Sequence, residues 1–160
     1  MDKSTLRMEL LAKRMSIMPA TQQELDAKIT KRFFRHFSLD NQTVASYQPR
    51  PKQNEVDCTS INNVIPAKYL TLIEPRPNAP FPHGQFRVII VPILGFDAHC
   101  NRIGMGGGWY ERFLGSQPDA VKIGLAYDLC RVKNGLQYEH YNIPLDAIIT
   151  DCGIYRRLDE

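Results

Sequence analysis

The sequence predicts an α/β fold: a single domain over residues 1–160, with a mostly parallel central sheet flanked by helices in three layers. Helical patterns and short apolar runs alternate along the chain, an order typical of strand–helix–strand units. Residues 87–94 are almost continuously apolar, as expected of a strand buried on both faces of a parallel sheet. A length of 160 residues suits one domain, and 43% apolar residues can fill its core.

Charge and cysteine content exclude several classes of protein. The 20 basic and 17 acidic residues leave a net charge of +3, which is small for a dedicated nucleic-acid-binding domain. No apolar run approaches the roughly 20 residues of a membrane span, and we expect no signal peptide. The four cysteines lie far apart, without the spacing of a zinc site. We therefore expect a cytoplasmic protein, a monomer or weak homodimer, without nucleic-acid or membrane partners.

Two amphipathic helices are predicted first. Over residues 2–18, apolar side chains recur every three to five positions between Lys and Arg, and Pro19 should end that helix. Thr21 followed by Glu24 has the pattern of a capping box, which predicts the start of a second helix. Apolar side chains then repeat every four residues, so this helix should reach about His36.

Shorter elements are predicted in the middle of the chain. Residues 43–47 and 69–73 are strand candidates. Between them, Asp57 or Thr59 could cap a brief helix that ends near Val64.

The second half of the chain continues the α/β order. Prolines over residues 74–84 predict a loop, which leads into the apolar strand at 87–94. A helix at 108–114 and strands at 121–127 and 147–150 should follow.

A glycine-rich turn before the helix at 108–114 is the most informative segment. Its glycines let the backbone take positive φ and bring bare amides close to a ligand. Amides at a helix start favour phosphate, and Arg102 would add a fixed cation with forked donors. The turn lacks the Gly-Lys-Ser/Thr end of a P-loop, and Trp109 excludes the dinucleotide fingerprint. A sharp turn without a ligand is the alternative interpretation.

The segment FDAHCNRIGMGGGWYERFL, residues 96–114, resembles the signature of the 5-formyltetrahydrofolate cyclo-ligase (methenyltetrahydrofolate synthetase) family, roughly FD-x-x-G-x-R-L-G-x-G-x-G-Y-Y-D-R-F-L. Residues 3–7 resemble the K-x-x-L-R start of that family, and 47–57 resemble its Y-x-P…E-x-D stretch. Residues 142–151 resemble its closing H-D-x-P-L-D-x-I-I-T-E. Several motifs in the right order are far more specific than any one of them.

The resemblance implies an enzyme that uses ATP and Mg²⁺ to close 5-formyltetrahydrofolate to 5,10-methenyltetrahydrofolate. Phosphorylation of the formyl oxygen would make it a leaving group, which the neighbouring amine of the reduced folate then displaces. In such a reaction the protein mainly positions the reactants and neutralises charge.

The motifs also imply the site residues. Lys3 and Arg7 would meet the nucleotide phosphates from one helix face. Arg50 and Glu55 would bind the folate, with Glu55 at the donor edge of the pterin. The residues expected around ATP are Arg102, Ile103, Gly104, Met105, Gly106, Gly107, Gly108, Trp109 and Tyr110.

The reacting groups and the metal are assigned in the same way. Tyr110 would lie near the formyl group, and Tyr110 and Arg102 are the expected catalytic residues. Glu111 and Asn142 stand where the family places its Mg²⁺-binding carboxylates.

Taken singly, these residues have simpler interpretations. Lys3 and Arg7 could form a solvated helix face, and Glu55 could cap the short helix that follows it. Trp109 and Tyr110 could be core aromatics with one polar tip in water. Only the joint order of the motifs favours the functional interpretation.

The sequence departs from the family pattern at several positions. Glu111 and Asn142 both replace aspartates, Cys100 replaces a glycine in the turn, and residues 65–69 look shortened on the folate side. These departures leave a second hypothesis open: a nucleotide-binding homologue with lost or altered folate specificity. A third hypothesis is an α/β interaction module built around the glycine turn.

Overall fold

A six-stranded sheet forms the centre of the structure, a computed structural model that describes residues 1–137 and 142–157. The strand order is β2-β1-β3-β6-β7-β8, and every neighbouring pair is parallel except β7 and β8. The strands are β1 (Val44–Tyr47), β2 (Leu70–Ile73), β3 (Val88–Pro92), β6 (Val121–Leu125), β7 (Ala147–Ile149) and β8 (Ile154–Arg156).

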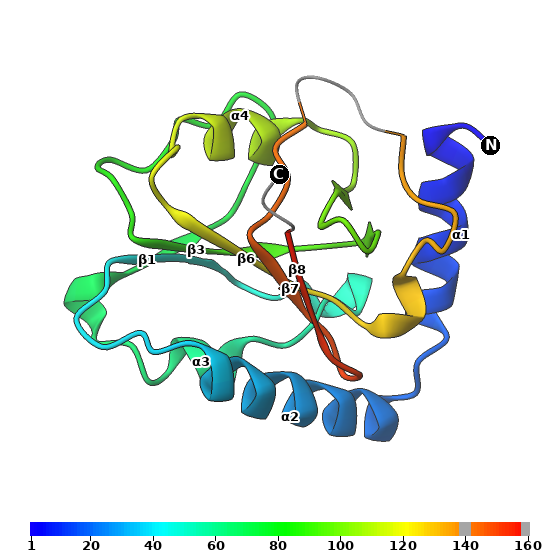
Figure 1. The fold of residues 1–160 in the computed structure, drawn as a ribbon, viewed down its shortest axis with the longest axis horizontal. Helices are drawn as coiled ribbons and strands as arrows, with labels where there is room; N and C mark the ends of the chain where they lie inside the picture. Colours follow the sequence, from blue (N-terminus) through cyan, green and yellow to red (C-terminus); the bar gives the residue numbers. More distant parts are fainter. Residues whose placement is uncertain (138–141, 158–160) are drawn as a thin grey trace.

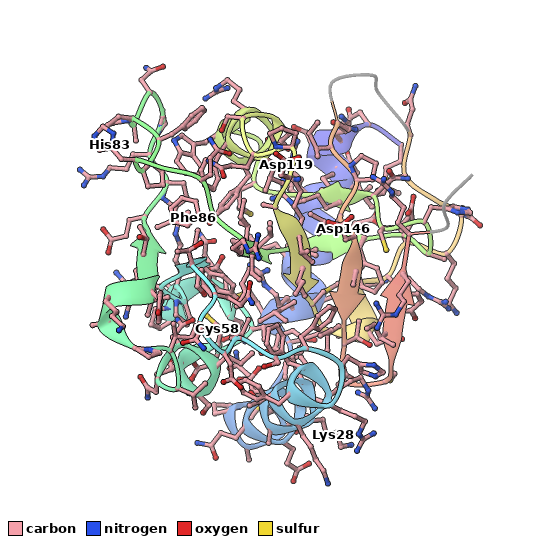
Figure 2. All side chains as sticks on the ribbon, turned by 60° about the vertical axis from the view of Figure 1, so that its left-hand side comes forward. Lys28, Cys58, His83, Phe86, Asp119 and Asp146 are labelled. Carbon is pink, nitrogen blue, oxygen red and sulfur yellow. The ribbon has the colours of Figure 1, made fainter. Side chains whose placement is uncertain are left out.

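Helices cover both faces of this sheet. α2 (Pro19–His36) and α3 (Thr59–Asn62) lie on one face, and α4 (Trp109–Gly115) lies on the other, as Figure 1 shows. Figure 2 shows Lys28 on the outer face of α2 and His83 in the outer part of the loop after β2. The predicted α/β fold with a mostly parallel sheet between helix layers is confirmed.

Strand β3 explains why both faces need a helix layer. Val88 and Ile90 belong to the apolar cluster that contains α2, whereas Ile89 and Val91 belong to the cluster that contains α4. Successive side chains of a strand point to opposite faces, so a strand with four apolar residues in a row must be covered on both. All four side chains are buried, as the sequence predicted.

Helix α1 (Lys3–Met15) lies outside both helix layers, beside the carboxyl ends of the strands (Figure 1). Its Leu10 is buried in a small apolar cluster with Leu94, Ile103 and Cys130. These three partners follow the sheet strands or belong to short elements between them, so α1 closes the end of the sheet.

The boundary between the first two helices differs from the prediction. α1 ends at Met15, and Pro19 begins α2 instead of ending the first helix, because proline suits a first helical position where no N–H partner is needed. The predicted capping box is wrong, since Thr21 and Glu24 lie inside α2 and its N-cap has no side-chain hydrogen bond. The predicted end at His36 is confirmed.

The other predicted elements are present with shifted ends. The N-cap residue of α3 is Cys58 and neither of the two predicted residues, although Asp57 accepts from the Thr59 amide at 2.9 Å directly before the helix. The sequence analysis missed β8 and several short elements. No described helix is both long and apolar enough to cross a membrane. The short elements are β4 (Gly95–Phe96), β5 (Arg102–Ile103), η1 (Pro51–Gln53), η2 (Ala67–Tyr69) and η3 (Asp128–Cys130).

Candidate active site

The candidate site lies at the carboxyl ends of the parallel strands. The chain runs from β1 outward to β2, then returns to β3 on the other side of β1 and continues outward to β6. In open α/β sheets, ligands bind in the crevice where the strand order reverses in this way. Gln48, Glu74 and Ile93, which directly follow β1, β2 and β3, line a cavity at this position.

Two cavities meet at this edge of the sheet. We name them after one lining residue each: the Glu55 cavity of about 800 Å³ and the Arg7 cavity of about 1020 Å³. Arg102, Gly104 and Glu111 line both cavities and so form their common wall. The Arg7 cavity suits an anion, because its basic lining residues outnumber its acidic ones, Asp2, Glu9, Glu111 and Asp128. The basic ones are Lys3, Arg7, Lys13, Arg102, Arg131 and Lys133.

The glycine-rich turn that joins this wall to α4 is open on its outer side. Met105, Gly106 and Gly107 are exposed, and no backbone amide from 104 to 108 donates a hydrogen bond within residues 1–137 and 142–157. Gly106 has φ of 105° and Gly108 has φ of 73°, values that favour glycine. Exposed, unpaired amides on such a turn can hold an anion. The turn therefore has donors and open space for an anion, as the functional interpretation requires.

Arg102 lies beneath the turn. Its Nη1 donates to Oε1 of Glu111 at 3.2 Å, and its Nη2 donates to the Pro92 carbonyl at 3.4 Å. The side chain is only 6% exposed, and its guanidinium carbon lies 5.4 Å from the centre of the Tyr110 ring. Its buried Nε has no partner among the described residues. The sequence predicted Arg102 as a fixed cation with forked donors, and the structure shows this cation paired with the Glu111 carboxylate.

The two aromatic residues that begin α4 differ in whether their polar atoms have hydrogen-bond partners. Trp109 donates its indole N–H to the Ala79 carbonyl at 3.0 Å and stacks on Phe113, so the core interpretation fits its side chain. Tyr110 lines the Glu55 cavity, and its buried hydroxyl has no partner in the described part of the chain. Burial raises the pKa of Tyr110, which keeps the hydroxyl protonated and able to donate.

Both residues expected to meet nucleotide phosphates from α1 line the Arg7 cavity, namely Lys3 and Arg7. Arg7 donates from Nε to the Gly104 carbonyl at 2.8 Å. Its guanidinium carbon is 3.2 Å from the point where a side chain on Gly106 would begin. The half-buried Arg7 therefore holds a cation against the glycine turn and is not part of a solvated face.

Glu55 and Arg50 lie together on the segment after β1, in the Glu55 cavity. Oε1 of Glu55 accepts from the Arg50 amide at 2.7 Å, and the Arg50 side chain donates to the Pro75 carbonyl at 3.2 Å. Burial raises the pKa of Glu55, while the Arg50 amide and the charge of Arg14 oppose that effect. The interpretation of Glu55 as a helix cap is wrong, because the N-cap residue of α3 is Cys58 and the Glu55 carboxylate accepts from the Arg50 amide.

Two further residues of the Glu55 cavity escaped the sequence analysis, Arg14 and Gln53. Arg14 is 3% exposed, and Gln53 has a buried Oε1 without a partner among the described residues. A signal for Arg14 was available: it follows Arg7 by seven positions and Leu10 by four, so the three share one helix face.

Glu111 and Asn142, the expected metal ligands, both line the Arg7 cavity. Over the described ranges, no group of three His, Cys, Asp or Glu side chains could hold a metal ion by itself. One carboxylate and one amide oxygen still suit Mg²⁺, which binds few protein ligands when phosphates and waters complete its shell. The donor set therefore fits a metal that arrives with a nucleotide.

Asp97, the aspartate of the glycine-turn signature, organises the chain before the turn. It is 2% exposed and accepts from the amides of His99, Asn101 and Leu136. Cys100 has φ of 64°, a left-handed conformation, which explains why the family pattern has glycine there. Asp97 thus fixes the hairpin that presents Arg102.

Comparisons with known proteins agree with the geometry. Residues 42–151 match the 5-formyltetrahydrofolate cyclo-ligase family. A 5-formyltetrahydrofolate cyclo-ligase of Mycoplasma pneumoniae is 30% identical over 171 aligned residues, which cover 94% of this chain and 99% of the relative.

Solved structures show the same fold. The 5,10-methenyltetrahydrofolate synthetase of Aquifex aeolicus matches with a TM-score of 0.79 at 24% identity, covering 100% of this chain and 95% of that one. A 5,10-methenyltetrahydrofolate synthetase from Mycoplasma pneumoniae matches with a TM-score of 0.74 at 22% identity, covering 94% and 99%.

Proposed function

The chain belongs to the 5-formyltetrahydrofolate cyclo-ligase family, and we propose that it catalyses the ATP-dependent closure of 5-formyltetrahydrofolate to 5,10-methenyltetrahydrofolate. The observation that carries this proposal is the pair of cavities with a common wall. The Arg7 cavity contains Lys3 and Arg7, the other cavity contains the half-buried carboxylate of Glu55, and Arg102, Gly104 and Glu111 line both. Two substrates bound in these cavities would meet at that wall.

The chemistry explains why two adjoining cavities are needed. The formyl oxygen attacks the terminal phosphorus of ATP, and ADP leaves. The neighbouring amine of the folate then attacks the activated formyl carbon, loses its proton, and phosphate departs with the former formyl oxygen. Positioning and charge neutralisation are the main contributions a protein makes to phosphoryl transfer.

The nucleotide half of the reaction is assigned to the Arg7 cavity and the glycine turn. Lys3 and Arg7 supply cations in the Arg7 cavity, and the free amides of residues 104–108 supply donors for phosphate oxygens. Gly104 lies in the common wall, and residues 105–108 line the Glu55 cavity beside it, so the triphosphate would extend across the wall. Arg7 already contacts the Gly104 carbonyl, so the cation and the turn are held together before a ligand binds. Such preorganisation reduces the cost of ordering the site.

Arg102 and Tyr110 act at the common wall. Arg102 has a buried donor without a partner, and Tyr110 has a buried, protonated hydroxyl beside it. Buried donors of this kind stabilise negative charge strongly, because the site excludes water. We assign Arg102 to the transferring phosphoryl group and Tyr110 to the formyl oxygen.

The folate half is assigned to the Glu55 cavity. A carboxylate accepts hydrogen bonds only, so Glu55 suits the N–H donor edge of a pterin. The Arg50 amide fixes one oxygen of Glu55, which leaves the other for a substrate. The side chain of Arg50 lies at the mouth of the same cavity.

Glu111 and Asn142 would hold Mg²⁺ together with the nucleotide. When bound, the metal ion would neutralise part of the negative charge on the phosphates. The ion pair with Arg102 holds the half-buried carboxylate of Glu111 at the common wall.

We also propose that the enzyme works in the cytoplasm as a monomer or weak homodimer. Cell fractionation and sedimentation over a range of concentrations test these two statements separately.

The decisive experiment mixes the purified protein with ATP, Mg²⁺ and 5-formyltetrahydrofolate and follows the absorbance of the methenyl product. ATP-dependent product formation supports the proposal. ATP binding without product would instead select a nucleotide-binding homologue with altered folate specificity. A protein that neither binds ATP nor forms product would contradict both.

A further inference from the structure

A buried arginine ties helix α1 to the segment that carries Glu55. Arg14 donates from Nε to the Gln53 carbonyl at 2.8 Å and from Nη1 to the Ile93 carbonyl at 3.1 Å. Burying a guanidinium is costly unless its N–H groups are paired, and both of these partners are backbone carbonyls. Arg14 therefore joins α1 to the segment after β1 and to the residues that follow β3.

The same segment is also bonded to α1 in the opposite direction. Nδ2 of Asn54 donates to the carbonyls of Arg14 at 3.1 Å and Ile17 at 3.3 Å. The Arg14 carbonyl also accepts from the Ile17 amide at 3.2 Å, so Asn54 adds a second donor at the C-terminal end of α1 and a donor to the Ile17 carbonyl just beyond it. Asn54 has φ of 51°, a left-handed conformation that turns the chain directly before Glu55.

These contacts determine where Glu55 lies. Its side chain accepts from the Arg50 amide within the same segment, and its carbonyl accepts from Nε2 of Gln22 at 3.3 Å, so the 50–55 segment is bonded across its own ends and attached to α2. Arg14 and Glu55 line the same cavity, and the charge of Arg14 favours the ionised form of that carboxylate. The cation thus supports both the position and the charge of Glu55.

We propose that Arg14 is a positioning residue for the folate substrate, because it holds the 50–55 segment in place and balances the carboxylate that accepts from the pterin. This inference rests on the function proposed above, in which Glu55 contacts the substrate. It adds a residue on α1 to the folate half, although α1 otherwise contributes the nucleotide contacts Lys3 and Arg7.

The position of Arg14 separates its effect from nucleotide binding. Arg14 does not line the Arg7 cavity, and its hydrogen-bond partners among the described residues are the carbonyls of Gln53 and Ile93 and not the glycine turn, although residues 105–108 of that turn also line the Glu55 cavity. Loss of its guanidinium should therefore weaken folate binding and leave ATP binding unchanged. A general destabilisation of the fold would affect both ligands.

The test compares R14M, R14K and the control R35M, which makes the same change at an exposed arginine of α2. The measurements are kcat, the KM for 5-formyltetrahydrofolate, and the calorimetric Kd values of ATP and of 5-formyltetrahydrofolate. We expect R14M to raise the folate KM and Kd about tenfold, with changes below about twofold in kcat and ATP Kd. R14K keeps the charge with fewer placed donors and should give intermediate values, and R35M should match the wild type.

A second variant, N54G, covers the case in which R14M fails to fold. Glycine accepts the left-handed φ of Asn54, so N54G removes the contact from the other side without straining the backbone, and the folate Kd should again rise.

An unchanged folate Kd in folded R14M or in N54G would overturn the inference, and so would an equal loss of ATP and folate affinity. If the wild-type protein binds folate but makes no product, the proposed function fails, while the Kd values of the variants still test the role of Arg14.

Discussion

Arg102 and Glu111 form an ion pair, with 3.2 Å between Nη1 and Oε1, in the wall that the Arg7 and Glu55 cavities share. In the proposed reaction, a phosphoryl group crosses from one cavity to the other at this wall. The pair therefore places a cation and a carboxylate where negative charge moves, and the unpaired Nε of Arg102 remains as a further donor.

Arg102→Ala should lower kcat/KM by about 100-fold or more and weaken ATP binding. The substitution removes the cation beneath the glycine turn and leaves Glu111 half-buried without its partner. Steady-state kinetics and calorimetry with ATP measure the two effects, and Arg35→Ala on the exposed face of α2 is the control. Unchanged ATP affinity in Arg102→Ala would contradict the role of this residue in the cradle.

Asn142→Asp should lower the Mg²⁺ concentration that gives half-maximal activity, because a second carboxylate strengthens a site that now has one. Glu111→Gln should raise that concentration for the opposite reason. Titrating activity with Mg²⁺ at fixed ATP measures both changes. A variant whose metal dependence equals that of the wild type would remove its residue from the metal site.

Tyr110→Phe should separate stability from activity. The hydroxyl is buried without a partner, so its removal should leave the free energy of unfolding unchanged or raise it by about 1 kcal/mol. The same change should lower kcat about tenfold or more, because the reacting oxygen loses a donor. Thermal unfolding and kcat are measured on one preparation, and a less stable variant would show that the hydroxyl has a structural partner after all.

The glycine turn offers a matched pair of substitutions. Gly106→Ala places a side chain at φ of 105° and against Arg7, whereas a side chain on Gly107 would meet nothing within 4 Å. We expect Gly106→Ala to destabilise the fold by about 1–2 kcal/mol and to weaken ATP binding, because the backbone of the turn must shift. Gly107→Ala should stay within about 0.5 kcal/mol of the wild type. Similar ATP affinities in the two variants would argue against a phosphate site at this turn.

Asp26 should make stability depend on pH. Burial raises the pKa of Asp26 to about 6 from 3.8, although the hydrogen bond from Tyr127 opposes this shift. Between these values the folded protein binds more protons than the unfolded chain, so stability falls as pH rises from about 4 to about 6 and stays reduced above that range.

Asp26→Asn cannot ionise, so the variant should have the higher Tm at about pH 8 and the same Tm as the wild type below about pH 4. After discounting for solvent screening, about 1 kcal/mol remains, which corresponds to roughly 2–4 °C in Tm. Thermal unfolding of both proteins at the two pH values gives the comparison. A difference in Tm that is the same at both would exclude the titration of Asp26 as its cause.

Features that depend only on residues close together in the chain could be predicted from the sequence. The apolar run of β3 predicts a buried strand, and the glycines before α4 predict a turn. Neither prediction depends on where distant segments of the chain pack. β8 escaped because its half-exposed residues Ile154 and Tyr155 have no strong pattern of their own, and the strand exists through pairing with β7.

Patterns in the sequence predicted the α/β order, a glycine-rich turn before α4 and the family to which the chain belongs. Only the tertiary structure decided how the charges are used. Arg102 is paired with Glu111 across the start of α4, and Arg14 contacts carbonyls 39 and 79 positions away in the chain. A pattern records which side chains alternate or repeat, whereas the partner of a buried charge depends on which distant segments the packed core brings together.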